Sequence, residues 1–182
     1  VKHDIATLPS DYVRAAKPVL IEDRILVPMW EKRFLWVMIE RTSGKVIWKT
    51  PVEGTPCADP IVVGKAIYCF VIEPDRTNYG MVYLQKLSAV DGQVLSSKHV
   101  LQFQMSAELL SSCRCFLAGD VLILQANRTV YGVSTSGQVL WTRVLAFTPK
   151  NADAALYDGL VQQSGPFVWD DSFIVSSPGC AA

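Results

Sequence analysis

Three copies of one short phrase recur along the 182-residue chain at nearly constant spacing. Each copy starts with glycine, continues with Lys or Gln, and then places valine and a second aliphatic residue before its last position. The copies are Gly44–Trp48, Gly92–Ser96 and Gly137–Trp141, whose glycines lie 48 and 45 residues apart. A period in this range indicates one supersecondary unit used several times, because such a unit cannot bury its apolar face alone and must stack on its neighbours.

Each unit follows the same order of four expected strands. In the first unit these are Pro18–Ile21, Ile25–Val27, Phe34–Ile39 and Lys45–Trp48. Val, Ile, Tyr and Phe fill the strands, and glycine occupies the turns where a left-handed backbone is needed. Strands at intervals of about 10 residues are typical of a sandwich, a barrel or a propeller. The repeat favours the propeller.

We therefore predict an all-β chain, a partial β-propeller of about three and a half four-stranded antiparallel blades. The whole of 1–182 is one propeller segment, with blades at about 16–51, 58–101 and 111–145 and an incomplete blade from 160. The segment Ser106–Leu110 is the best rival for a helix, but it is too short for a confident assignment. Three longer connections interrupt the period, at 73–80, 102–112 and 146–165.

Composition excludes several classes of function. Lys and Arg together number 17, as do Asp and Glu, so the formal net charge is zero. Nothing in this balance attracts nucleic acid or an anionic membrane, and we expect no nucleic-acid partner. No apolar run approaches the ~18 residues that a membrane helix needs, so we also expect no membrane span.

Residues that carry catalytic or metal chemistry are few. The Cys113-Arg-Cys115 pair has no second pair of ligands at zinc-site spacing, so we predict no metal site. The chain has two histidines and no G-x-S-x-G sequence, so we predict no catalytic residues. Most of the cysteines are expected to be small apolar residues of the core; they are Cys57, Cys69, Cys113, Cys115 and Cys180.

The phrases Ser43–Trp48, Leu87–Leu95 and Ser136–Trp141 resemble the PQQ-type repeat. That repeat builds the propellers of quinoprotein alcohol dehydrogenases and of non-enzymatic relatives such as the outer-membrane assembly lipoprotein of Gram-negative bacteria. The resemblance implies that Trp48 and Trp141 dock one blade on the next, whereas Ser96 takes the place of the corresponding tryptophan. It also implies a location outside the cytoplasm, in the periplasm, and closure of a ring with seven or eight blades. On that basis we expect the chain to be a fragment whose remaining blades lie in other sequence or in a partner.

Two functions stay open. The first is a non-catalytic binding or scaffolding module with a protein partner and no cofactor. Lys17, Asp59 and Arg114 stand just before the innermost strands, so they are candidates for a mixed-charge binding patch at one mouth of the channel if those strands line it, although ordinary solvated turn residues explain them as well. The alternative is a fragment of a quinoprotein dehydrogenase whose PQQ and Ca²⁺ site lies largely in absent blades. The chain has no adjacent cysteine pair of the kind found in many such enzymes, so the enzyme question stays open, leaning to no.

Overall fold

The computed structural model describes residues 16–74, 79–104, 113–126, 129–144, 167–169 and 172–174, and the side chains of most of them. The chain divides into two compact units, Val1–Met105 and Ser106–Ala182. All regular elements in the described residues are β-strands, so the all-β prediction is confirmed. The segment Ser106–Leu110, which was the best candidate for a helix, and the connection at 146–165 lie outside the described residues.

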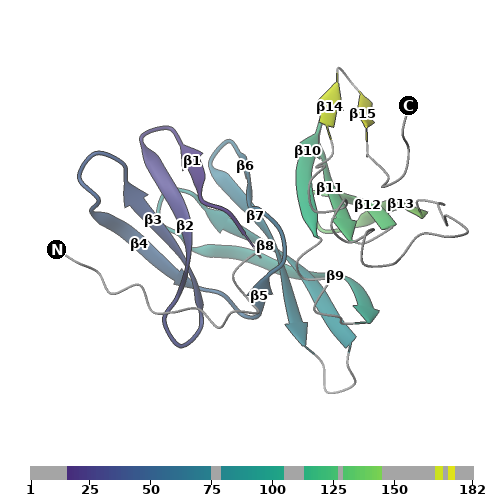
Figure 1. The fold of residues 1–182 in the computed structure, drawn as a ribbon, viewed down its shortest axis with the longest axis horizontal. Helices are drawn as coiled ribbons and strands as arrows, with labels where there is room; N and C mark the ends of the chain where they lie inside the picture. Colours follow the sequence, from purple (N-terminus) through teal and green to yellow (C-terminus); the bar gives the residue numbers. More distant parts are fainter. Residues whose placement is uncertain are drawn as a thin grey trace, which may run out of the picture. The chain divides into compact units, whose positions relative to one another are not determined.

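The first sheet is a four-stranded antiparallel meander in the order β1-β2-β3-β4 (Figure 1). Each strand pairs with the next along the chain, as expected for strands that are joined by short turns. Its strands are β1 (Val19–Ile21), β2 (Arg24–Trp30), β3 (Phe34–Glu40) and β4 (Val46–Pro51).

The second sheet has five strands instead of the four predicted. The additional two-residue strand β5 pairs with the same edge of β7 as β6 does, at Ile72 and Val71. Four residues separate β5 from β6, whereas two residues of β7 separate their partners Val71 and Tyr68, so the pairing along this edge is interrupted. The strands are β5 (Thr55–Pro56), β6 (Ile61–Val63), β7 (Ala66–Pro74), β8 (Tyr79–Ser88) and β9 (Val94–Gln104).

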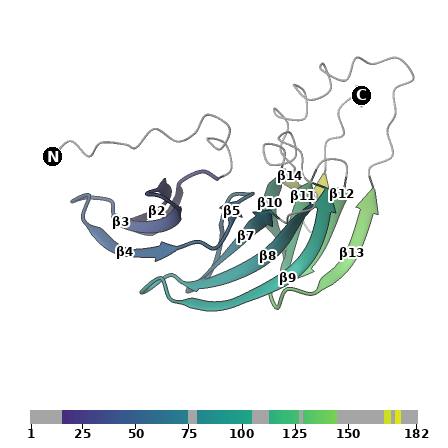
Figure 2. The ribbon, with the colours of Figure 1, turned by 90° about the horizontal axis from the view of Figure 1, so that it is seen from below.

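Strands β7, β8 and β9 are longer than their counterparts in the first sheet. The pairing of β7 with β8 continues to Pro74 and Gly80, so this hairpin extends into the predicted connection at 73–80. Figure 2 shows β8 and β9 as long, curved strands that run side by side. The outermost strand β9 covers 11 residues, whereas β4 covers 6.

The second unit contains a third four-stranded meander in the order β10-β11-β12-β13. A separate two-stranded hairpin follows, and it is all that the structure describes of the predicted incomplete blade from 160. The strands are β10 (Arg114–Ala118), β11 (Val121–Ala126), β12 (Thr129–Ser134), β13 (Val139–Val144), β14 (Phe167–Trp169) and β15 (Ser172–Ile174).

Within the first unit, the first and second sheets enclose one apolar core. Alternate residues of β3 and of β7 contribute to it, because successive side chains of a strand point to opposite faces. From β3 come Phe34, Trp36 and Met38, and from β7 come Ile67, Cys69 and Val71. Trp48, Leu87 and Ala89 complete the outer part of this core. The buried indole N–H of Trp36 has no hydrogen-bond partner in the described structure.

The repeated phrase forms the same irregularity in all three meanders. The register between the last two strands shifts at Met38/Ile39, at Lys86/Leu87 and at Gly132/Val133. The residue skipped on the outer strand is Ile47, Leu95 or Leu140, each one position before the end of the phrase. Such a bulge adds one residue to the outer strand and increases the local twist. The sequence repeat is therefore also a repeat of backbone geometry.

The turn before β9 is fixed by its own side chains. The N–H of Gln93 donates to the carboxylate of Asp91 over 3.2 Å, and the N–H of Val90 donates to the Ser88 hydroxyl over 3.3 Å. A hydrogen bond from Ser88 and then the Gln93 N–H lower the pKa of Asp91 below its ordinary value of 3.8, because both favour the charged form. The carboxylate therefore stabilises this turn only while it is ionised.

Replacing Ser88 by alanine is expected to raise the pKa of Asp91 toward 3.8, because the hydroxyl supplies the largest favourable contact to the carboxylate. A carboxyl whose pKa is lowered by folding adds stability above its unfolded pKa, and this contribution is lost as the pH falls through its folded pKa. The variant should therefore show a weaker acid-dependent contribution from Asp91. An NMR titration of the Asp91 carboxyl carbon measures the shift, with Ser136→Ala in the third sheet as control. An unchanged pKa in Ser88→Ala would contradict the assignment.

Candidate functional site

Two of the three residues predicted to line a channel mouth lie in the first unit and contact each other. Lys17 precedes β1 and Asp59 precedes β6, and the backbone N–H of Lys17 donates to Asp59 Oδ1 over 2.7 Å. Arg114 begins β10 in the second unit, where its guanidinium donates to the carbonyl of Cys113 over 2.8 Å. The Asp59 carboxylate thus connects the residue before β6 of the second sheet with the residues before β1 of the first sheet. A shared patch with Arg114 stays a prediction.

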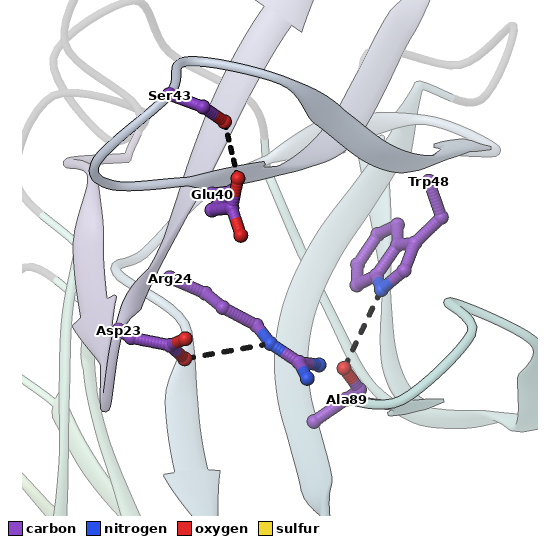
Figure 3. Close-up of polar contacts among 6 residues, drawn as sticks. All are labelled: Asp23, Arg24, Glu40, Ser43, Trp48 and Ala89. Carbon is purple, nitrogen blue, oxygen red and sulfur yellow. Dashed lines mark hydrogen bonds and ion pairs between the residues drawn. The ribbon is translucent and has the colours of Figure 1, made fainter.

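Trp48 has the contacts that a residue between two sheets requires. Its side chain is 8% exposed, and its indole N–H points to the carbonyl oxygen of Ala89 over 3.4 Å (Figure 3). Two residues later, the hydroxyl of Thr50 donates to the carbonyl of Gly92 over 2.6 Å. Strand β4 of the first sheet is therefore hydrogen-bonded at two points to the β8–β9 turn of the second sheet.

Gly92 is required at this contact for two separate reasons. Its φ of +74° lies in the left-handed region that residues with a Cβ adopt at a cost. A Cβ at this position would also lie 2.5 Å from Cε3 of Trp48 and 2.5 Å from Oγ1 of Thr50. Gly92, which follows the turn after β8, thus provides the flat surface against which the Trp48 indole packs.

Trp141 occupies the equivalent register position of the third sheet. It pairs with Gly132 on β12, as Trp48 pairs with Met38 on β3. A Cβ on Gly132 would lie 2.2 Å from Cε2 of Trp141, so the half-buried indole lies over this glycine of its own sheet. The docking role of Trp141 toward a following blade stays a prediction.

Ser96 takes this position in the second sheet, where it pairs with Lys86. It keeps the bulge and the strand register but has no ring to place against a neighbour. The bulge therefore depends on the turn and the preceding aliphatic residues, and not on the tryptophan. Sequence reasoning missed the bulge, because a strand with one extra residue keeps the same residue types as a regular strand.

Chemically reactive groups are scarce among the described residues. Cys69 is fully buried in the core, and burial raises the pKa of its thiol, so it stays protonated at neutral pH. The Cys57 thiol is also buried and contacts the carbonyl of Phe70 over 3.5 Å. No group of three or more His, Cys, Asp or Glu side chains in this part of the chain could hold a metal ion. The same part has no helix long and apolar enough to cross a membrane.

Comparison with known proteins agrees with the repeated meanders and their tryptophans. A family model described as outer membrane protein assembly factor BamB matches residues 11–180. The chain is thus a β-propeller protein built from PQQ-type repeats, as the resemblance implied. It belongs to the family of the outer membrane protein assembly factor BamB.

One solved structure shows the same fold at low sequence identity. BamB from Moraxella catarrhalis aligns with a TM-score of 0.51 and 10% identity, over 86% of this chain and 44% of that one. A quinohemoprotein alcohol dehydrogenase from Comamonas testosteroni aligns with a TM-score of 0.47 and 12% identity, over 71% of this chain and 20% of that one. The chain spans less than half the length of either protein, and no curated protein matches its sequence.

The Gly92→Ala variant is expected to lose more stability than Gly44→Ala. Both glycines have positive φ, so each substitution carries backbone strain of about 1 kcal/mol. Only Gly92 contacts Trp48 and Thr50, and overpacking there adds about 1–3 kcal/mol, whereas a Cβ on Gly44 meets nothing within 4 Å. Urea unfolding midpoints measure the difference. Equal losses in the two variants would show that the indole does not depend on Gly92.

Trp48→Ala is expected to cost about 3–5 kcal/mol of unfolding free energy, because a large buried ring leaves a cavity between two sheets. If the residue docks the sheets, amide protection should fall in β3 and in β7 together, since both contribute alternate residues to the shared core. Hydrogen exchange resolved by residue measures this. Loss of protection confined to β4 would assign Trp48 a role in its own strand alone.

Proposed function

We propose that this chain is part of a non-catalytic propeller that binds or scaffolds other proteins outside the cytoplasm. The family match over residues 11–180 carries this proposal, because the family is named for an assembly factor of the outer membrane. Assembly factors act through protein contacts, and a rigid propeller offers loops and strand edges for them. The expected location is the periplasm, and the expected partner is a protein of the cell envelope.

The described side chains agree with this proposal. They include a buried, protonated thiol at Cys69 in the core and exposed aliphatic residues at the surface. Surfaces with exposed apolar side chains among polar ones are common at protein interfaces.

The test uses the full-length protein. We expect isothermal titration to show binding of neither PQQ nor Ca²⁺, and we expect a stoichiometric complex with a second purified envelope protein. Chemical crosslinks in that complex should include residues of this chain. Bound PQQ together with dye-linked oxidation of an alcohol would overturn the proposal and establish the dehydrogenase alternative.

A further inference from the structure

The β8–β9 turn contains a dipeptide that the corresponding turns of the other two meanders lack. The glycine of the repeated phrase follows Asp91 in the second sheet, whereas it follows a serine, Ser43 or Ser136, in the first and third sheets. An aspartate followed by glycine is among the sequences most prone to isomerisation of the backbone, because glycine has no side chain to hinder attack by its own nitrogen. One repeat of the chain therefore carries a site for covalent change in its turn.

The reaction at such a dipeptide consumes nothing but water. The backbone nitrogen of Gly92 attacks the carboxyl carbon of Asp91 in its protonated form, a nitrogen–carbon bond forms, and the carboxyl hydroxyl leaves as water with the amide proton. Water then opens the cyclic imide at either carbonyl. One opening restores aspartate. The other produces isoaspartate, in which the main chain runs through the side-chain carboxyl carbon and is longer by one methylene.

The folded turn holds both reacting groups in other contacts. The N–H of Gly92 donates to the carbonyl of Ser88 over 2.9 Å, and the carboxylate of Asp91 accepts the N–H of Gln93 over 3.2 Å. The hydrogen bonds from Ser88 and then from Gln93 lower the pKa of Asp91, so its protonated form is rare at neutral pH. Attack on the carboxyl carbon therefore requires the turn to open.

The first sheet holds the same turn from outside. The carbonyl of Gly92 accepts the hydroxyl of Thr50 over 2.6 Å, and the carbonyl of Ala89 accepts the indole N–H of Trp48 over 3.4 Å (Figure 3). A Cβ on the buried Gly92 would lie 2.5 Å from Trp48 and 2.5 Å from Thr50, so no free space remains beside it. The peptide bonds before and after Gly92 are thus fixed, one by its own turn and the other by the first sheet.

We propose that Asp91–Gly92 is an isomerisation site that the contact between the first two sheets keeps unreactive. When the first sheet separates from the turn, Gly92 is released and the imide forms as it does in an unfolded peptide. Isoaspartate then adds a methylene to the main chain, which a close-packed contact between two sheets does not accommodate. The modified turn therefore stays undocked, and the site records each molecule in which the two sheets have separated.

The first sheet shows which unreactive residue suits this turn. The hydroxyl of Ser43 accepts the N–H of Lys45 over 3.1 Å, which is the same hydrogen bond that Asp91 accepts from Gln93. Asp91→Ser therefore keeps the local hydrogen bond and removes the carboxyl carbon that reacts. This variant is the matched control for every measurement below.

The experiment incubates the full-length protein at neutral pH in water enriched in heavy oxygen. Each passage through the imide incorporates a heavy oxygen, so peptide mapping by mass spectrometry counts the reaction at residue 91 and keeps it apart from Asp158-Gly159, which lies outside the described residues. We expect the folded protein to react at least about tenfold more slowly than a synthetic peptide of residues 86–96. Equal rates in the protein and the peptide would overturn the proposal.

Variants identify the contact that protects the site. Thr50→Val removes one hydrogen bond to Gly92 at nearly constant volume, so the reaction at residue 91 should become about fivefold faster. Ile123→Val removes a methylene from the buried part of the third sheet in the other unit, and its effect on residue 91 should stay within about twofold. An unchanged rate in Thr50→Val, or an equal increase in Ile123→Val, would show that docking of the first sheet does not protect the turn.

The consequence of the reaction is measured on the modified protein itself. Molecules with isoaspartate at residue 91 are separated from unmodified ones by ion exchange, and we expect a lower urea midpoint and less amide protection in β4 and in the β8–β9 turn. Asp91→Ser incubated in the same way should keep its midpoint. If the isoaspartate form retains the midpoint and the protection of the unmodified protein, the lengthened turn still docks and the proposal fails.

Discussion

The contact of the Trp48 indole with the β8–β9 turn joins the two sheets of the first unit through a single side chain. The ring is nearly buried, lies against Gly92, and donates its N–H to Ala89. A sheet of four short strands cannot bury both of its faces, so each repeat needs a neighbour. An indole suits this position because it covers a large apolar area and has a single polar group to satisfy.

Three hydrogen bonds that involve side chains of the first unit span nearly the same number of residues. They join Trp48 with Ala89, Thr50 with Gly92, and Lys17 with Asp59, at separations of 41 or 42 residues. These separations in sequence are close to the period of the repeat, so the bonds connect one repeat to the next. The first two lie at the outer strands and the third lies before the innermost strands. The first and second sheets are therefore joined both at their outer strands and before their innermost strands. The apolar core lies between these two sets of contacts.

Much of the architecture could be predicted from local patterns, whereas several features could not. Strand alternation and turn glycines predicted the meanders, and the resemblance pointed to Trp48. The additional strand β5 was missed, because two residues carry no strand pattern of their own and only their pairing with β7 defines them. The bulge at Ile47, Leu95 and Leu140 was also missed, since a strand with one extra residue looks continuous in sequence. The link between Lys17 and Asp59 uses a backbone N–H, and no side-chain pattern indicates it.

The sequence by itself determined the class of fold, the period of its units and the positions of its turns. Those properties depend on residues close together in the chain, through backbone conformation and the alternation of strand faces. Only the tertiary structure decided which carbonyl accepts the Trp48 N–H, why Gly92 tolerates no side chain, and which aliphatic residues remain at the surface. Each of these depends on distances between residues of two different sheets, and such distances are set by packing, which the order of residues does not display.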